Sequence, residues 1–196
     1  VHNRDKVGLI NGMWAGSLGL GGILPIECIF IPSKIPLSIK ATGSLEKVIK
    51  ESTEVACSVA WSKLSTRQKN KLNKKWEKFS EGIHIHCPEG AVPKDGPSAG
   101  TALTIALYSL FTNKPIPYNI AITGEINLQG DVMTIGGLEE KLQGAKKAGV
   151  VKAFIPRGNE KDLYKIRQRV PKLFNNFNVK IVDHVDDVMK IVFKKC

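Results

Sequence analysis

The stretch "PEGAVPKDGPSAGTALTIALYSLF", residues 88–111, decides how this chain folds. Its first half is a loop rich in proline and glycine, and its second half repeats apolar residues with the period of a helix. Ser98 stands at the junction between the two halves. Pro97 suits a first helical turn, and Asp95 is a candidate N-cap. The pattern therefore predicts a helix that begins close to Ser98.

A serine at a helix start has two interpretations. It is either an ordinary residue that bonds its own first turn, or a nucleophile. The unpaired N–H groups of a helix start can stabilise an oxyanion, and neighbouring glycines let another backbone approach closely. A serine hydroxyl is nevertheless a weak nucleophile unless a base takes its proton. The identity of that base decides the function.

A lysine is the first candidate base. In the helix predicted from Leu138, the residues Leu138, Leu142 and Ala145 form an apolar stripe, and Lys141 is the only charged residue on it. Burial lowers the pKa of an ammonium group, and the neutral amine can then act as a base. The structural alternative is a lysine that reaches solvent from the edge of the stripe, or a buried salt bridge.

A histidine is the second candidate base. The letters "GPSAG" match the GxSxG nucleophile elbow of α/β-hydrolases, in which an acid and then a histidine follow the serine. His184 is the only histidine after Ser98, and Asp131 or Asp162 would supply the acid. A Ser-Asp-His esterase therefore remains one alternative, and it requires His184 to reach Ser98. A catalytically idle binding module, which would form no adduct at Ser98, is another.

His84 and His86 alternate on one face of a predicted strand. No nearby cysteine or carboxylate completes a convincing ligand set, so we predict no metal site there and assign both histidines a structural or site-supporting role.

The chain has 196 residues and a formal net charge of +11, which would suit an acidic partner. Much of this charge lies in "TRQKNKLNKKWEKF", residues 66–79. There Leu72, Trp76 and Phe79 form one apolar stripe, which predicts a surface helix. Weak nucleic-acid binding is a secondary expectation, and it would depend on Lys69, Lys71, Lys74 and Lys75.

The four cysteines are widely spaced and form no CxxC pair. We expect thiols in a reducing intracellular compartment, and the sequence does not distinguish the cytoplasm from the mitochondrial matrix. No apolar run is long enough to span a bilayer, so no membrane partner is expected.

Strands and helices are expected to form one α+β (mixed α/β) domain over residues 1–196. Its N-terminal part reads as β-rich, and strands and helices alternate after it. Pro25, Pro32 and Pro36 suggest strand edges or bulges rather than a central parallel sheet. The segment 125–137 reads as a hairpin that turns at Gln129 and Gly130.

The combined motifs resemble the proteolytic domain of Lon proteases over nearly the whole chain. The resemblance rests on "PEGAVPKDGPSAG" and "AITGEINLQGDVMTIGGLEEKLQGAKKAG", supported by "KATGSLEKVIKESTEVA" and "GIHIHCPEGA". The step of 43 residues from Ser98 to Lys141 is the family's serine–lysine spacing.

The resemblance implies a serine endopeptidase in which Ser98 is the nucleophile, Lys141 the general base and Thr123 the residue that orients the lysine. It places Asp95, Glu27 and His84 near the site. It also implies polypeptide substrates, such as unfolded or damaged proteins, and a hexameric ring. No cofactor is expected in this domain. ATP and Mg would bind an ATPase module upstream, of which this chain would be a fragment.

Two features depart from the family pattern. The segment "NGMWAGSLGLGG", residues 11–22, replaces a shorter loop that usually reads "GLAWT", and Ala15 stands in place of the threonine. This loop borders the substrate groove of the family. The chain also lacks the GxxxxGK[ST] motif of an ATPase.

Overall fold

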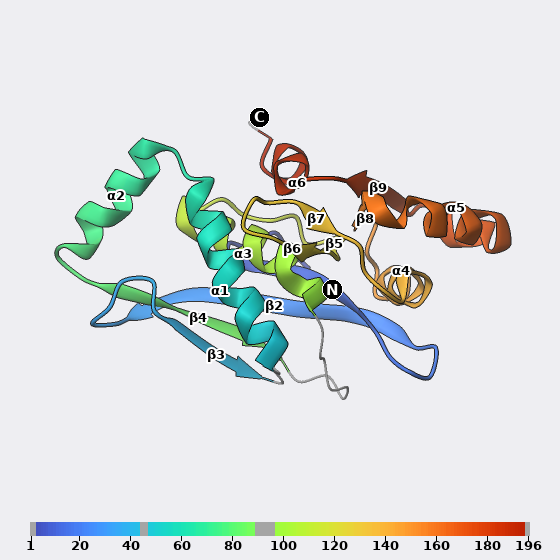
Figure 1. Ribbon diagram of the computed structural model, residues 1–196, viewed down its shortest axis with the longest axis horizontal. Coiled ribbons are helices and arrows are strands. Elements are labelled where there is room, and N and C mark those ends of the chain that lie inside the picture. The colour runs from blue at the N-terminus through green and yellow to red at the C-terminus, as the bar shows by residue number, and fades with distance from the viewer. Residues whose placement is uncertain (1–2, 44–46, 89–96, 195–196) are drawn as a thin grey trace.

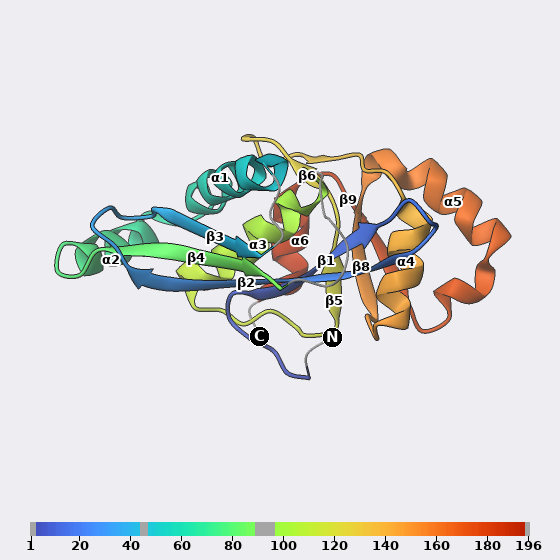
Figure 2. The ribbon, with the colours of Figure 1, turned by 90° about the horizontal axis from the view of Figure 1, so that it is seen from below.

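The computed structural model describes residues 3–43, 47–88 and 97–194, and a mixed sheet of seven strands organises this part of the chain (Figures 1 and 2). The spatial order is β3-β4-β2-β1-β5-β8-β9. The strands are β1 (Leu9–Ala15), β2 (Gly21–Pro32), β3 (Ile39–Gly43), β4 (Glu81–Cys87), β5 (Ile120–Ile122), β8 (Lys152–Pro156) and β9 (Asn178–Val182). The predicted mixed α/β fold class is confirmed.

Helices cover the sheet, and a small hairpin lies beside it. The helices are α1 (Lys47–Ser62), α2 (Thr66–Trp76), α3 (Gly100–Thr112), α4 (Leu138–Lys147), α5 (Glu160–Arg169) and α6 (Val185–Val192). Short 3-10 turns are η1 (Pro97–Ala99), η2 (Arg157–Asn159) and η3 (Pro171–Phe174). Strands β6 (Glu125–Ile126) and β7 (Val132–Met133) form the hairpin, which turns at the predicted place.

The two halves of the sheet differ in strand direction. β2 pairs antiparallel with β1, to which a short turn joins it, and also with β4. The outer strand β3 pairs parallel with β4. β1, β5, β8 and β9 pair parallel, and helices connect β5 to β8 and β8 to β9. The carboxyl ends of the parallel strands therefore lie at one edge, which is where ligand and catalytic sites commonly form.

The sheet separates two apolar cores. Successive residues of β5 point to opposite faces, so Ile120 and Ile122 join the core with α1, α3 and α6, whereas Ala121 joins the core with α4 and α5. Figure 1 shows α2 and α5 at opposite ends of the molecule.

The structure agrees with the prediction for Pro25. Pro25 lies in β2, which is an inner strand of the sheet order. It faces β1 through Asn11, whereas the pairing with β4 begins only at Glu27. Pro25 thus has a neighbouring strand on one side only, which explains why a residue without an N–H is tolerated there.

Helix α3 is buried on almost every side, whereas the sequence pattern suggested one apolar face. It packs between the sheet and α1, so Thr101, Thr104 and Ser109 are buried along with its apolar residues. The helix begins at Gly100, directly after the η1 turn that contains Ser98. The predicted cap Asp95 lies outside the described residues.

Helix α2 begins with a capping box between Ser65 and Gln68. Leu72 and Trp76 are buried as predicted, but the prediction for Phe79 was wrong, because its side chain is 76% exposed. The helix ends at Trp76, so Phe79 no longer follows the helical stripe.

Cys28, Cys57 and Cys87 are buried as thiols, while Cys196 lies outside the described residues. Burial disfavours the thiolate and raises the pKa of Cys57 to about 11, and it raises the pKa of Cys28 further. No helix in the described ranges is long and apolar enough to cross a membrane.

Candidate active site

Lys141 lies on the buried face of α4, as its helical position predicted. Its side chain is only 5% exposed, and Leu142 and Ala145 beside it are fully buried. Loss of hydration disfavours the ammonium form and lowers the pKa of Lys141 from 10.5 to about 8. A useful fraction of the amine is therefore neutral near neutral pH.

Thr123 is the hydrogen-bond partner of this lysine. Lys141 Nζ donates to Thr123 Oγ1 at 3.3 Å, in a fully buried position directly after β5. The N–H of Thr123 donates to the carbonyl of Phe154 in β8 at 3.1 Å. The hydroxyl that accepts a hydrogen bond from the amine thus lies at the end of a parallel strand.

Ser98 is tied through its backbone to the residue that follows Thr123. The carbonyl of Ser98 accepts the N–H of Gly124 at 2.8 Å, and the carbonyl of Gly124 accepts the N–H of Thr101 at 3.0 Å. Ser98 and Lys141 are therefore each one hydrogen bond from the pair Thr123–Gly124. The Ser98 side chain is partly exposed, and its hydroxyl hydrogen-bonds none of the described residues.

Two glycines allow this close arrangement. A Cβ on Gly100 would lie 2.9 Å from Ile126 Cγ2, and one on Gly124 would lie 2.5 Å from Val132 Cγ1. The start of α3 therefore packs directly on the β6–β7 hairpin, which begins immediately after Thr123 and Gly124.

The β1–β2 hairpin contacts the middle of helix α4 and holds it in position. A Cβ on Gly144 would lie 2.2 Å from the carbonyl carbon of Gly21, and one on Gly21 would lie 1.9 Å from the carbonyl oxygen of Glu140. The helix and the start of β2 touch backbone to backbone, which fixes the depth at which Lys141 enters the protein.

Asn159 anchors the segment that leads into α4. Its buried side chain accepts the N–H of Ile135 at 3.0 Å and donates to the carbonyl of the same residue at 2.8 Å. Sequence reasoning missed Asn159, Gly21 and Gly144. The only signal for Asn159 is an asparagine at a helix start, which is more simply explained as a cap.

Of the remaining predicted site residues, the histidines lie on β4 and Glu27 lies on β2. His84 and His86 both contact Thr42 Oγ1 at 2.8 Å, which links β4 to the edge strand β3. Glu27 is exposed in β2, opposite His86. Asp95 lies outside the described residues. Within the part of the chain that the structure describes, no cluster of three or more histidine, cysteine or acidic residues has a geometry that would hold a metal ion.

His184 is engaged away from Ser98. Its Nδ1 accepts the N–H of Asp186 at 3.1 Å, and its Nε2 lies 2.9 Å from the carbonyl of Gln129. Because both ring nitrogens are occupied, His184 is not placed to take a proton from Ser98, and the esterase alternative is not favoured. Asp131 and Asp162 accept from Asn127 and Asn159 instead.

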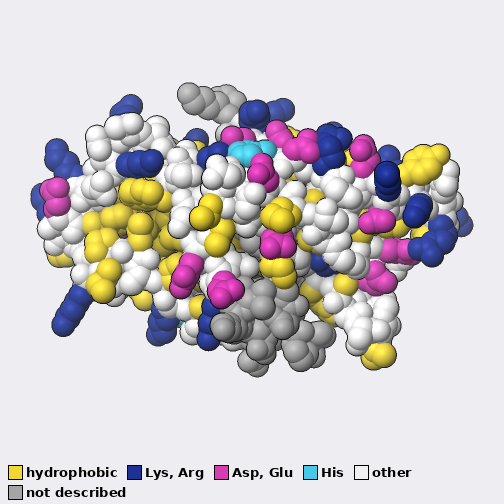
Figure 3. All heavy atoms as spheres, viewed as in Figure 1, with side chains coloured by type: hydrophobic (Ala, Val, Ile, Leu, Met, Phe, Trp, Pro, Cys, Tyr) yellow, Lys and Arg dark blue, Asp and Glu magenta, His cyan; other side chains and the backbone are white. Residues whose placement is uncertain are grey.

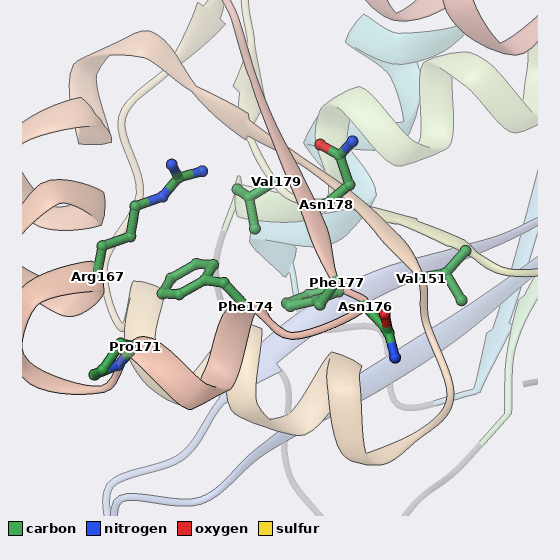
Figure 4. Close-up of a pocket in the computed structure, with 8 residues that line it drawn as sticks. All are labelled: Val151, Arg167, Pro171, Phe174, Asn176, Phe177, Asn178 and Val179. Carbon is green, nitrogen blue, oxygen red and sulfur yellow. The ribbon is translucent and has the colours of Figure 1, made fainter.

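A depression of about 590 Å³ lies elsewhere, between α5, η3 and the start of β9 (Figure 4). Its lining includes Arg167, Phe174 and Phe177, and none of the predicted site residues. The guanidinium of Arg167 lies over the ring of Phe174 at 5.1 Å.

Comparison with known proteins identifies the family. The family model for the Lon protease (S16) C-terminal proteolytic domain matches residues 1–195. The chain belongs to this family. A Lon protease homolog of Acanthamoeba polyphaga mimivirus is 39% identical over 195 residues, which cover 96% of this chain and 19% of that protein.

Bacterial relatives show the same pattern. The Lon protease of Mesomycoplasma hyopneumoniae is 41% identical, over 99% of this chain and 21% of that protein. Lon protease 2 of Desulfotalea psychrophila is 42% identical, over 97% of this chain and 23% of that protein. The chain thus spans about a fifth of the length of these Lon proteases. Membership in the Lon proteolytic family supports a peptidase function.

Proposed function

We propose that this Lon-type domain is a serine endopeptidase in which Ser98 is the nucleophile and Lys141 the general base. The observation that carries the proposal is the buried Lys141 amine, bonded to Thr123, next to a backbone link between Gly124 and Ser98. A lysine with a pKa of about 8 is a base suited to neutral pH.

The reaction follows from these roles. Neutral Lys141 Nζ takes the proton of Ser98 Oγ while Oγ attacks the carbonyl carbon of the substrate. The C–N bond then breaks, and the lysine ammonium gives its proton to the leaving amine. Water attacks the resulting ester with Lys141 again as base, which releases the new carboxyl end and restores Ser98.

One feature supports this route at the transition state. The N–H groups near the start of α3 lie at the positive end of the helix dipole, so they are the expected donors to the oxyanion. Ser98 Oγ does not yet bond Lys141, and such contacts commonly tighten only when substrate binds.

The β1–β2 turn is the expected edge of the substrate groove. The N–H of Gly16 bonds the carbonyl of Leu20 at 2.7 Å, and Leu18 and Leu20 are both exposed at the tip. The departure from the family pattern over residues 11–22 thus places apolar side chains where they would affect cleavage preference. Asp95, Glu27 and His84 are proposed to support the site.

The whole protein is proposed to be an ATP-dependent protease that cleaves unfolded or damaged proteins. The relatives are named Lon proteases and are about five times as long as residues 1–196. An upstream ATPase module would bind ATP and Mg, and the ring would be a homo-hexamer. The buried thiols suit a reducing compartment, the cytoplasm or the mitochondrial matrix.

Binding of a peptide boronate, which forms a tetrahedral adduct with an active serine, tests the dyad in the intact protein. Ser98→Ala and Lys141→Met should abolish the adduct, whereas His184→Ala should retain it. Folding of each variant is checked by circular dichroism. An adduct that survives Ser98→Ala, or one lost only with His184→Ala, would contradict the proposal.

A further inference from the structure

A groove of about 410 Å³ lies between α2 and the C-terminal end of α3. Apolar side chains make up its floor, and polar or basic ones line the rest: Phe30, Leu72, Leu110, Phe111, Gln68, Lys71, Lys75, Thr112 and Asn113. Hydrophobic side chains gather on the face beside α2 (Figure 3). Ser98 precedes the opposite end of α3, about 18 Å away along the helix.

Aromatic packing keeps the floor of this groove in place. The ring centroids of Phe30 and Phe111 are 6.2 Å apart, and those of Phe30 and Trp76 are 6.3 Å apart. Trp61 stacks on Trp76 at 5.7 Å and meets Phe111 edge-on at 6.0 Å. These four aromatic side chains hold one another in place, so the groove is preformed. A ligand can therefore bind without a rearrangement that would lower its affinity.

The charge of α2 indicates what the groove would accept. Between residues 66 and 76 the helix carries five basic residues and no acidic one: Arg67, Lys69, Lys71, Lys74 and Lys75. Lys75 is paired with Glu81 at 2.6 Å and lies over the Phe30 ring at 5.0 Å. Lys71 is exposed at the rim, and it forms no ion pair with the described residues.

We propose that this groove docks an acidic amphipathic peptide segment of a partner or substrate protein. Apolar side chains of the segment fill the space between Leu72, Leu110 and Phe111. Its carboxylates pair with Lys71, because Lys75 is already paired with Glu81. This is the arrangement by which amphipathic helices bind hydrophobic grooves. The proposal does not rest on catalysis at Ser98.

Nucleic acid explains the same charge less well. Phosphate contacts need only exposed cations and would leave the apolar floor unused. A nucleic acid would also engage Lys74, which lies on α2 but does not line the groove. The two ligand classes therefore predict different losses of affinity when Lys71 or Lys74 is substituted.

The probe is a fluorescein-labelled synthetic peptide of about 16 residues, with Leu at i, i+3, i+4 and i+7 and Glu at the flanking positions. Binding is measured by fluorescence anisotropy in the intact protein with Ser98→Ala. Lys71→Glu should weaken binding about tenfold, whereas the matched change Lys74→Glu should weaken it less than about threefold. A peptide with Lys in place of Glu should not bind.

Three results would overturn the proposal. The first is no binding of the acidic peptide at about 100 μM. The second is equal weakening by Lys71→Glu and Lys74→Glu, together with binding of a DNA duplex that both changes weaken, because this pattern assigns the face to nucleic acid. The third is equal binding of the lysine-containing peptide. Since the assay uses the Ser98→Ala background, a failed dyad proposal would not alter any of these outcomes.

Discussion

Replacing Lys141 with methionine should make the fold more stable at pH 7 while it removes peptidase activity. Methionine has a similar length and no charge, so it fills the same buried space without a desolvation penalty. The fall of the lysine pKa from 10.5 to about 8 corresponds to a penalty of about 3 kcal/mol for burying the charged amine. Lys141→Met should therefore gain up to about 3 kcal/mol in free energy of unfolding.

The dependence on pH has a definite sign. Between pH 8 and 10.5 the unfolded chain holds a proton on Lys141 that the folded chain has lost, so stability rises with pH across this window. Below pH 8 both states are charged and the full penalty applies. The advantage of Lys141→Met should thus be constant below pH 7 and shrink from pH 8 upward.

Urea unfolding of the two proteins between pH 6 and pH 10 measures this difference. Lys147→Met, an exposed change on the same helix, is the control and should shift stability by less than about 0.5 kcal/mol at every pH. A variant Lys141→Met that is less stable than the parent at pH 7, or a gain that does not change with pH, would refute the reasoning.

The pH dependence of peptide cleavage should report the titration of Lys141. With a pKa of about 8, about one Lys141 amine in ten is neutral at pH 7. kcat/KM should therefore rise about tenfold per pH unit below pH 7 and level off above pH 8 to 9. An inflection near pH 6.5 would instead indicate a histidine base.

Two further substitutions test how α4 is held. Gly144→Ala should destabilise the protein by about 1–3 kcal/mol in urea unfolding, because its Cβ would overlap Gly21. Gly136→Ala is the matched control, since its Cβ would meet nothing within 4 Å. Asn159→Asp should cost about 3–5 kcal/mol at pH 7, because a buried carboxylate cannot donate to the Ile135 carbonyl. This deficit should shrink at pH 5 as the carboxyl gains a proton, and a deficit independent of pH would contradict the interpretation.

Local patterns failed where a residue's burial depends on its neighbours. The apolar period suggested one buried face for α3, but α1 covers the other side as well. Phe79 continued the stripe in the sequence, but the helix ends at Trp76. Pro25 correctly indicated a strand edge, but only the pairing of β2 with β1 and β4 shows that this edge lies inside the sheet.

The sequence by itself determined the elements that local periodicity encodes. The 3.6-residue pattern from Leu138 identified Lys141 as a charge on a buried face, and the loop before residue 100 indicated Ser98 at a helix start. The motif letters indicated the family. These signals arise within a few residues of one another, so they can be read without knowing the packing of the whole chain.

Only the tertiary structure decided how these elements meet. The link from Ser98 to Gly124, the bond from Lys141 to Thr123 and the pairing of Asn159 with Ile135 each join residues 18 to 26 positions apart. The backbone contact of Gly21 with Gly144 joins the start of β2 to α4, which lie far apart in the sequence. Such contacts have no local period, because they depend on where the sheet and helices bring distant backbone atoms together.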